Sequence, residues 1–307
     1  MRWHYDDPTK LSHRMLLKWY HRNGLNVMGA TAAATGETPF MPRNDSRAQY
    51  IKDFCELVSK NELDGIISTA WDDGSPHWET VMRGFIAQGE FGWNPESRTV
   101  EQFITAHARR EWGLERRLVT FISEMEQAAF FFDGALVTSG SRNPAWGVTE
   151  SFELIQLPDT LKPGEWSLLY KGRLDTARIE QKRYEIVDAK SHALRNRYTL
   201  EIYDQTNELF HYPVRLLLAL EAYDLSRKKG KGQEDAKVRI KDVCFDFIQL
   251  REKFESIYSC TRFMQNPDGY ISDQNHHNHL AALSNSSEWW YLYELSITKK
   301  IMDWINK

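Results

Sequence analysis

Residues Asp64–Trp93 read DGIISTAWDDGSPHWETVMRGFIAQGEFGW, and this stretch decides the fold. It opens with a short apolar run, Ile66–Ala70, in which apolar and polar side chains do not alternate. Such a run is typical of a strand buried on both faces, as in a parallel sheet. Ser75 and Pro76 then offer an N-cap and a first helical residue, which predicts that a helix follows at once. Strand, polar loop and helix together make one βα unit.

Two more units of this kind precede it. The strands are expected at Met1–Tyr5 and Asn26–Ala33, each followed by a helix with amphipathic spacing. With Gly65–Trp71 they predict three adjacent parallel strands in chain order. The sequence has no Gly-x-Gly-x-x-Gly, which disfavours a dinucleotide-binding fold. A (β/α)8 barrel is the better candidate, and these would be its last three βα units.

The βα pattern stops after Trp93. Thr99 is expected to cap a helix, and residues 133–164 are predicted to form a long irregular connection. Helical spacing then predicts helices at 183–207, 212–225, 236–264 and 286–305. The predicted fold is therefore α/β followed by all-α. The boundary is placed near Arg110, with residues 1–109 forming the barrel part and residues 110–307 a helical C-terminal domain.

Composition limits the classes of function. The chain has 307 residues, of which 41% are hydrophobic and 27% charged, as in globular proteins. The net charge of −4 disfavours a nucleic-acid partner, and the basic run Arg227–Gly232 is interpreted as a solvated loop between helices. No apolar run is long enough to predict a membrane span. Cys55, Cys244 and Cys260 are too widely spaced to indicate a metal motif or a disulfide framework.

Two pairs of carboxylates follow predicted strands. Asp72–Asp73 come directly after Trp71, and Asp6–Asp7 come after Trp3 and Tyr5. Carboxylates bind sugar hydroxyls through charge-assisted hydrogen bonds, and aromatic rings pack on the apolar face of a pyranose. The alternative is that these aspartates cap the turns and helices that follow. The predicted substrate-binding residues, for a glycan ligand, are Trp71, Asp72, Asp73, Trp3 and Tyr5.

Other polar residues favour structural roles. Arg83 and Glu90 lie two turns apart on the predicted helix and are expected to tie it to its neighbours. The segment 273–279 contains Asp273, His276 and His279, which could ligate a metal ion, but a polar loop is the preferred interpretation. No metal site and no cofactor are predicted. The sequence also has no Gly-x-Ser-x-Gly or Cys/His arrangement for nucleophilic catalysis.

The spacing of Trp71-x-Asp73, Arg83, Glu90 and Trp93 resembles the end of the catalytic barrel in family 20 glycoside hydrolases, the β-N-acetylhexosaminidases. In that family the eighth strand carries a Trp-x-Glu that holds the terminal sugar, and here Asp73 is the shorter carboxylate. The resemblance implies that the three predicted strands are the sixth, seventh and eighth of a barrel. It also implies a terminal N-acetylhexosamine of a glycan as substrate.

The resemblance also shows what this chain lacks. The family uses an Asp-Glu dipeptide after its fourth strand, in which Glu is the general acid/base and Asp orients the acetamido group of the substrate. The sequence contains no Asp-Glu dipeptide, so the chain is expected to begin after that point and to be inactive alone. The family's Tyr-x-Asp of the seventh strand is replaced by Thr35–Thr38. Export or a periplasmic location would follow only if a signal peptide preceded Met1.

Three other functions remain open. The chain could be a carbohydrate-binding protein of the same descent without catalysis, or an interaction module built on the long helices. Asp72 and Asp73 could in principle form an acid/base pair by themselves. Neighbouring residues seldom straddle one glycosidic bond, however, because two-carboxylate mechanisms need about 5–9 Å between the groups.

Overall fold

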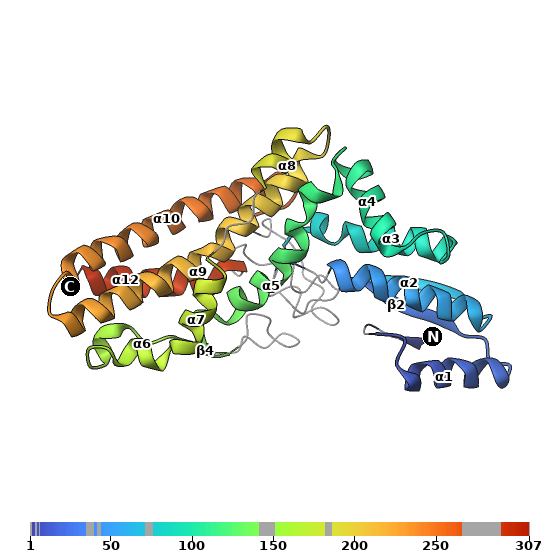
Figure 1. Cartoon of the computed structure of the whole chain (residues 1–307), viewed down its shortest axis with the longest axis horizontal. Coiled ribbons are helices and arrows are strands. Elements are labelled where there is room, and N and C mark those ends of the chain that lie inside the picture. The colour runs from blue at the N-terminus through green and yellow to red at the C-terminus, as the bar shows by residue number, and fades with distance from the viewer. Residues whose placement is uncertain are drawn as a thin grey trace. The chain divides into compact units, whose positions relative to one another are not determined.

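The computed structural model describes residues 2–3, 5, 7–34, 40–41, 44–70, 76–140, 151–181, 186–265 and 290–306. The chain divides into two compact units. Unit 1 comprises Met1–Glu126 and Glu185–Tyr203, and unit 2 comprises Gln127–Tyr184 and Asp204–Lys307. Most of the described chain is helical, with a small parallel sheet in unit 1 and a two-stranded sheet in unit 2 (Figure 1). The predicted boundary near Arg110 falls inside unit 1.

The sheet of unit 1 is parallel. Its strands are β1 (Arg2–Trp3), β2 (Met28–Ala34) and β3 (Gly65–Ala70), and they lie in the order β1-β2-β3. Ala30 of β2 lies opposite both Trp3 and Ile67, which fixes the register of the three strands. The predicted adjacent parallel strands in chain order are therefore confirmed. Within the described residues these strands do not close a barrel.

The sequence predicted that the strand containing Ile66–Ala70, which is β3, is buried on both faces. In the structure β2 is the buried strand instead. Every residue of β2 after Met28 is buried, whereas β3 is half-buried along its whole length. β2 is the central strand, and the helices α2 (Asn44–Lys60) and α3 (Met82–Trp93) both pack on it. β3 is an edge strand of the described sheet, which leaves it less covered.

Close packing of helices on β2 depends on two glycines. A Cβ at Gly29 would lie 2.6 Å from the Phe54 ring of α2, and a Cβ at Gly84 of α3 would lie 1.9 Å from the Ala33 carbonyl oxygen. Both positions therefore need the absence of a side chain. The core beside them consists of Ala48, Ile51, Cys55, Ala87, Phe91 and Phe103.

The helix expected after β1 is α1 (Leu11–Arg22), and Lys10 precedes its first turn. Its apolar stripe is exposed. Leu11, Met15 and Trp19, spaced four residues apart, are 71%, 61% and 53% exposed, while Leu17 is buried.

The helix after β3 begins later than predicted. Pro76 lies outside any helix, a 3-10 turn, η1 (Trp78–Thr80), comes next, and α3 begins only at Met82. His77 has an extended backbone with φ −123° and ψ 111°, which prevents a helix from running through it. The Thr80 hydroxyl donates a hydrogen bond of 2.9 Å to the His77 carbonyl oxygen and stabilises the 3-10 turn.

The rest of unit 1 is helical. The predicted cap at Thr99 is confirmed, because Thr99 and Gln102 form a capping box at the start of α4 (Val100–Glu111). A 3-10 turn, η2 (Arg116–Val119), then precedes α5 (Phe121–Gly134). A short helix, α8 (Val187–His192), and the first residues of α9 complete this unit.

Long helices dominate unit 2. They are α9 (Arg197–Lys229), α10 (Gln233–Ser259) and α12 (Leu292–Ile305). Separate helices predicted at 183–207 and 212–225 are wrong, because α9 continues through Pro213. α10 packs against α12: the Tyr291 hydroxyl, just before α12, donates a hydrogen bond of 2.7 Å to Glu255, and the Phe254 and Tyr291 rings lie 5.4 Å apart.

The region 133–164, predicted to be irregular, contains a small sheet. β4 (Val137–Ser139) pairs antiparallel with β5 (Glu153–Leu154), and a 3-10 turn, η4 (Pro158–Thr160), follows. Arg173, on α7 (Lys171–Ile179), donates hydrogen bonds to the carbonyl oxygens of Ala135 and Val137 and fixes β4 to that helix. These distant contacts, which the local sequence does not reveal, give the region its order.

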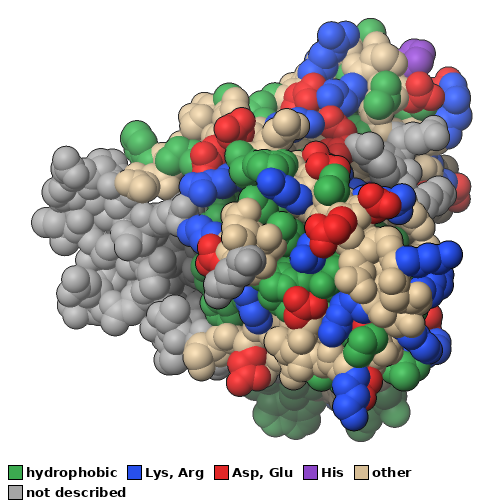
Figure 2. Space-filling view, turned by 90° about the vertical axis from the view of Figure 1, so that its left-hand side faces the viewer, with side chains coloured by type: hydrophobic (Ala, Val, Ile, Leu, Met, Phe, Trp, Pro, Cys, Tyr) green, Lys and Arg blue, Asp and Glu red, His purple; other side chains and the backbone are tan. Residues whose placement is uncertain are grey.

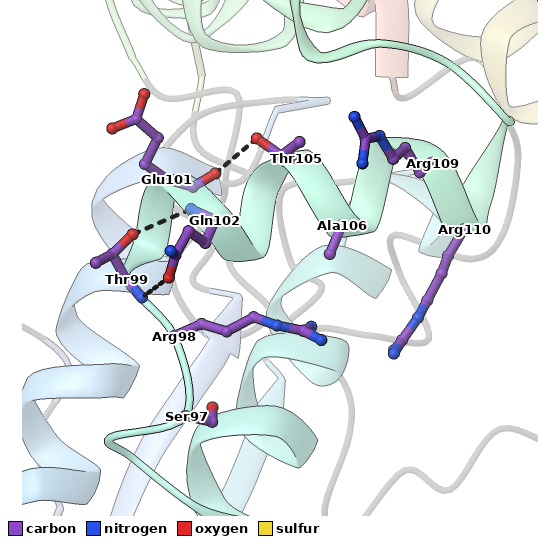
Figure 3. A pocket seen from close by; sticks show the side chains of 9 residues that line it. All are labelled: Ser97, Arg98, Thr99, Glu101, Gln102, Thr105, Ala106, Arg109 and Arg110. Atoms are coloured by element: carbon purple, nitrogen blue, oxygen red, sulfur yellow. Dashed lines mark hydrogen bonds between the residues drawn. The ribbon is translucent and has the colours of Figure 1, made fainter.

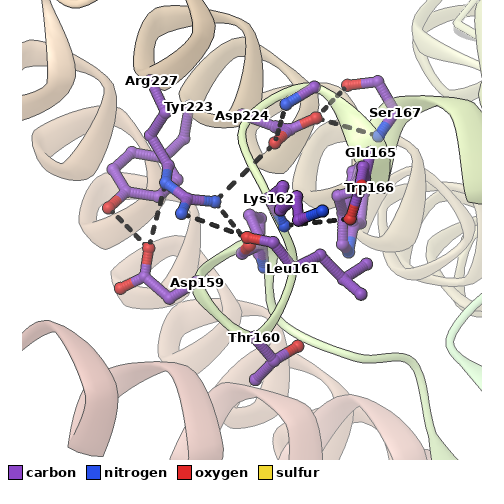
Figure 4. A network of polar contacts seen from close by, with 12 residues as sticks. Asp159, Thr160, Leu161, Lys162, Glu165, Trp166, Ser167, Tyr223, Asp224 and Arg227 are labelled. Carbon is purple, nitrogen blue, oxygen red and sulfur yellow. Dashed lines mark hydrogen bonds and ion pairs between the residues drawn. The ribbon is translucent and has the colours of Figure 1, made fainter.

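A buried carboxylate organises the start of α6 (Glu165–Leu169). Asp224 of α9 is fully buried and accepts hydrogen bonds of 2.9 Å from the Gly164 and Ser167 amides and of 2.7 Å from the Ser167 hydroxyl (Figure 4). Asp224 thus serves α6 as an N-cap although it lies 60 residues away in the sequence. Gly164 has φ +89°, a left-handed conformation that favours glycine.

Arg227 completes this network. Its guanidinium donates to the Pro158 and Leu161 carbonyl oxygens and lies 3.5 Å from Asp159 (Figure 4). The run Arg227–Gly232 therefore begins with a structural arginine, and only its later residues form the exposed turn between α9 and α10 that the sequence predicts.

Candidate functional site

The carboxyl edge of the parallel sheet is the candidate site. Because β1, β2 and β3 are parallel, their carboxyl ends face the same side of the sheet. β1 ends at Trp3, and β3 ends at Ala70, directly before the predicted sugar-binding residues. Trp71, Asp72 and Asp73 themselves lie outside the described residues. Their approach to Trp3 and Tyr5 therefore stays a prediction.

The two aromatic residues predicted at the end of β1 lie side by side. The rings of Trp3 and Tyr5 are 6.0 Å apart and meet edge to face at 69°. Trp3 is 42% exposed and Tyr5 is half-buried. A partly exposed indole supported by a second ring is a suitable surface for the apolar face of a sugar.

Arg47 anchors the segment after β1, a role that no sequence pattern indicated. It is 2% exposed, and its guanidinium donates a hydrogen bond to the Tyr5 carbonyl oxygen. The guanidinium also lies 5.9 Å from the centre of the Tyr50 ring. Arg47 belongs to α2, where a single arginine on an amphipathic helix is indistinguishable from a solvated one by sequence pattern. This residue fixes the backbone that carries Tyr5.

Asp7 has the capping role that the sequence left open. Its carboxylate accepts hydrogen bonds from the Thr9 amide at 2.9 Å and from the Thr9 hydroxyl at 2.6 Å. This is an Asx turn, which leads the chain from β1 into α1. Asp6 lies outside the described residues.

Arg83 and Glu90 do not share a site. Glu90 lies 3.1 Å from the Arg98 guanidinium and accepts a hydrogen bond of 3.2 Å from Ser97, so it ties α3 to the following loop as predicted. Arg83 is buried, at 4% exposed. Burial lowers the pKa of His107 to about 3, and the positive charge of Arg83 contributes to this lowering. Trp93, part of the family resemblance, is 93% exposed.

An open polar groove runs along α4 in the same unit. Its volume is about 860 Å³, and its lining residues are Ser97, Arg98, Thr99, Glu101, Gln102, Thr105, Ala106, Arg109 and Arg110. Arg98 and Arg110 extend along one side of the helix, with Ala106 between them (Figure 3). Polar side chains dominate its lining, which distinguishes it from typical small-molecule sites. It contains none of the predicted sugar-binding residues.

The described residues show no metal centre: they contain no group of three or more His, Cys, Asp or Glu side chains placed to hold an ion. Asp273, His276 and His279 lie outside the described residues. None of the described helices combines the length and the apolar character needed to cross a membrane. On the face drawn in Figure 2, basic and acidic side chains are interspersed. Comparison with protein-family models and with curated proteins finds no match to this sequence.

Proposed function

We propose that the three βα units are a segment of a (β/α)8 barrel and that their carboxyl edge forms part of a sugar site like that of β-N-acetylhexosaminidases. The observation that carries the proposal is the parallel order of the strands. The parallel order places the carboxyl ends of β1 and β3 at the same edge of the sheet. They lie about 10 Å apart there, because β2 separates them and each pair of neighbouring strands is about 5 Å apart. Trp3 and Tyr5 lie at the end of one strand, and Trp71 and Asp73 follow the other. The ligand would be the terminal N-acetylhexosamine of a glycan.

Each residue has a chemical task in this proposal. Trp3 and Trp71 would pack on the apolar face of the pyranose, and Tyr5 would support the Trp3 ring. Asp73 would accept hydrogen bonds from two sugar hydroxyls, with Asp72 beside it. Arg47 would act indirectly, by fixing the backbone at Tyr5.

Binding is tested on the full chain with the methyl β-glycoside of N-acetylglucosamine, by saturation-transfer NMR and calorimetry. We expect weak, saturable binding that Trp3→Ala and Trp71→Ala each reduce by roughly two- to tenfold, because each substitution removes a stacking surface. Asp73→Asn should also weaken binding. Trp93→Ala is the matched control, since this tryptophan is almost fully exposed and lies at the far end of α3.

Equal losses for Trp93→Ala and for Trp3→Ala would contradict the proposed site. Absence of any saturable binding would instead favour the alternative, an interaction module built on the long helices. That alternative has one observation in its favour: Val238, Phe245 and Ile248 on α10 are all about half exposed or more, at 57%, 47% and 47%.

Hydrolysis is a separate question. The sequence has no Asp-Glu dipeptide, to which the resemblance assigns both the general acid and the residue that orients the acetamido group. General acid–base help contributes about 10²–10⁴ in rate, so we propose that this chain alone binds sugar without cleaving it. The assay uses a chromogenic aryl N-acetyl-β-glucosaminide, with an Asp72→Ala/Asp73→Ala double variant as the comparison. Robust turnover that the double variant abolishes would make Asp72 and Asp73 the catalytic pair.

A further inference from the structure

The solvent-facing side of α10, in unit 2, has an apolar centre. One side of this helix is buried in the unit, through Ala236, Ile240, Cys244, Phe247, Leu250 and Phe254. On the opposite side Phe245 and Ile248 are each 47% exposed. They lie three residues apart on the helix, so their side chains are neighbours and form one apolar patch. This patch is separate from the proposed sugar site, which lies in unit 1.

A charged residue lies at each end of the patch, and the two charges have opposite signs. Lys241 comes one turn before Phe245, and Glu252 comes one turn after Ile248. The Lys241 Nζ lies 5.7 Å from the centre of the Phe245 ring, at the border of the patch. Within the part of the chain that the structure describes, neither Lys241 nor Glu252 forms an ion pair. Both charges therefore remain for a binding partner.

The spacing of these four residues is the same in both directions along the helix. The steps from Lys241 to Phe245, Ile248 and Glu252 are four, three and four residues. Alternating steps of four and three place side chains in one line on a helix, and two helices pack side by side along such a line. The middle of this line also coincides, to within one residue, with the middle of α10 (Gln233–Ser259).

This symmetry makes the line complementary to itself when two copies run antiparallel. With the middles of both helices aligned, Lys241 lies opposite Glu252 of the partner subunit, and Phe245 lies opposite Ile248 of the partner subunit. A two-fold axis repeats each contact, which gives two apolar contacts in the centre and one ion pair at each end. Parallel helices would instead place Lys241 opposite Lys241 of the partner subunit, where like charges repel.

We propose that the solvent-facing side of α10 is a dimerisation surface, at which a second copy of this chain binds in the antiparallel orientation. The occupant is a second copy because both the charges and the apolar side chains of this line are complementary to the same line reversed. A strip about 40 Å long and 10 Å wide on each copy buries about 800 Å² in total, the size of a weak and transient interface. The dimer is therefore reversible, with a Kd in the micromolar range. This proposal does not depend on the proposed sugar site.

The test is sedimentation equilibrium of the full chain without sugar, at concentrations from about 5 to about 500 µM. We expect a monomer–dimer equilibrium. Phe245→Gln should weaken association at least about tenfold, because the symmetry removes a ring from both apolar contacts at once. Lys241→Glu and Glu252→Lys should each weaken it about tenfold, because each creates two pairs of like charges.

The double variant Lys241→Glu/Glu252→Lys tests the antiparallel orientation. It restores opposite charges at both ends of the line, so it should dimerise within about threefold of the unmodified chain although each single variant is weak. Two parallel helices would gain nothing from this exchange, because each residue would still face its own copy.

Ile179→Gln is the matched control for Phe245→Gln. It replaces an apolar residue at the end of α7 that is 75% exposed in the same unit, and it should dimerise as the unmodified chain does. Circular dichroism checks that every variant keeps its helices. The proposal is overturned if the chain stays monomeric at the highest concentration, if Phe245→Gln and Ile179→Gln have equal effects, or if the double variant dimerises as weakly as the two single charge reversals.

Discussion

His107 shows how a single residue couples the stability of unit 1 to pH. It is 5% exposed, and its ring lies 6.1 Å from the Phe103 ring and 5.4 Å from the Trp112 ring. Burial among aromatic rings penalises the charged imidazolium and lowers the pKa of His107 to about 3, with a further contribution from Arg83. The folded protein therefore keeps this side chain neutral, whereas the unfolded chain protonates it near its ordinary value of 6.5.

From this difference we predict the effect of a substitution. As pH falls from about 6.5 toward 3, the unfolded state gains a proton that the folded state does not, so the free energy of unfolding falls. Between pH 7 and pH 5 this one group should cost about 2 kcal/mol. His107→Leu should remove that part of the pH dependence, as measured by urea unfolding at both pH values.

The matched control is His192→Gln, which changes an exposed histidine of α8. It should unfold with the pH dependence of the unmodified chain. If His107→Leu also kept that dependence, another group would be responsible for it.

At the scale of elements, α3 lies very close to β2 at Gly84. The Gly84 Cα packs against the backbone of Ala33, and there is no room for a methyl group between them. Gly89 lies on the same helix, and a methyl group added there would have nothing within 4 Å. One helix thus contains a glycine that packing requires and a glycine that packing does not require.

Alanine substitutions at these two glycines should have opposite effects. Gly84→Ala should destabilise unit 1 by about 1–3 kcal/mol, because α3 must move away from β2. Gly89→Ala should stabilise it by about 0.5–1 kcal/mol, because alanine loses less backbone entropy in a helix. Chemical denaturation of the two variants measures both values. A similar change in the two variants would show that helix propensity, not the contact with Ala33, decides their stability.

The sequence predicted those strands and helix starts that depend on residues close together in the chain. The apolar runs before Ala34 and Ala70 indicated parallel strands, and Thr99 indicated a helix start, because the formation of a strand and the capping of a helix depend on nearby residues. The break predicted between residues 207 and 212 is wrong, because α9 runs through it and also holds Pro213 inside the helix. His77, whose extended backbone delays α3, carries no such signal in the sequence.

The candidate site was predictable to a similar degree. The sequence predicted that Trp3 and Tyr5 lie together at a strand end, because residues this close in the chain are also close in space. Arg47 was missed because its partner, the Tyr5 carbonyl oxygen, lies 42 residues away and is a backbone atom common to all residues.

At the scale of the whole molecule, the chain passes from one unit to the other more than once. Residues 185–203 return to unit 1 after residues 127–184 have contributed to unit 2. The returning segment is firmly held: the Leu194 amide donates a hydrogen bond of 2.8 Å to the Trp112 carbonyl oxygen, and Asn196 donates one of 3.0 Å to Glu111. Unit 1 is therefore not a continuous piece of sequence.

This arrangement predicts how fragments behave. Residues 1–126 expressed alone should lack the cooperative unfolding transition of unit 1, because the surface around Trp112 is uncovered. A synthetic peptide of residues 185–203 added in trans should raise the thermal midpoint of that fragment, and a peptide of the same composition in scrambled order is the control. Cooperative unfolding of residues 1–126 without the peptide would show that the returning segment is dispensable.

The distant cap of α6 also has a consequence for the order of events during synthesis. α6 has only five residues, too few to be stable alone, and its start is held by Asp224. The ribosome makes Gly164 60 residues before it makes Asp224, an interval of roughly 3–12 s at ordinary elongation rates. During that interval α6 has no cap, so nascent chains that stop short of residue 224 should be cleaved by protease between Lys162 and Leu169, and chains extended through α9 should be protected there.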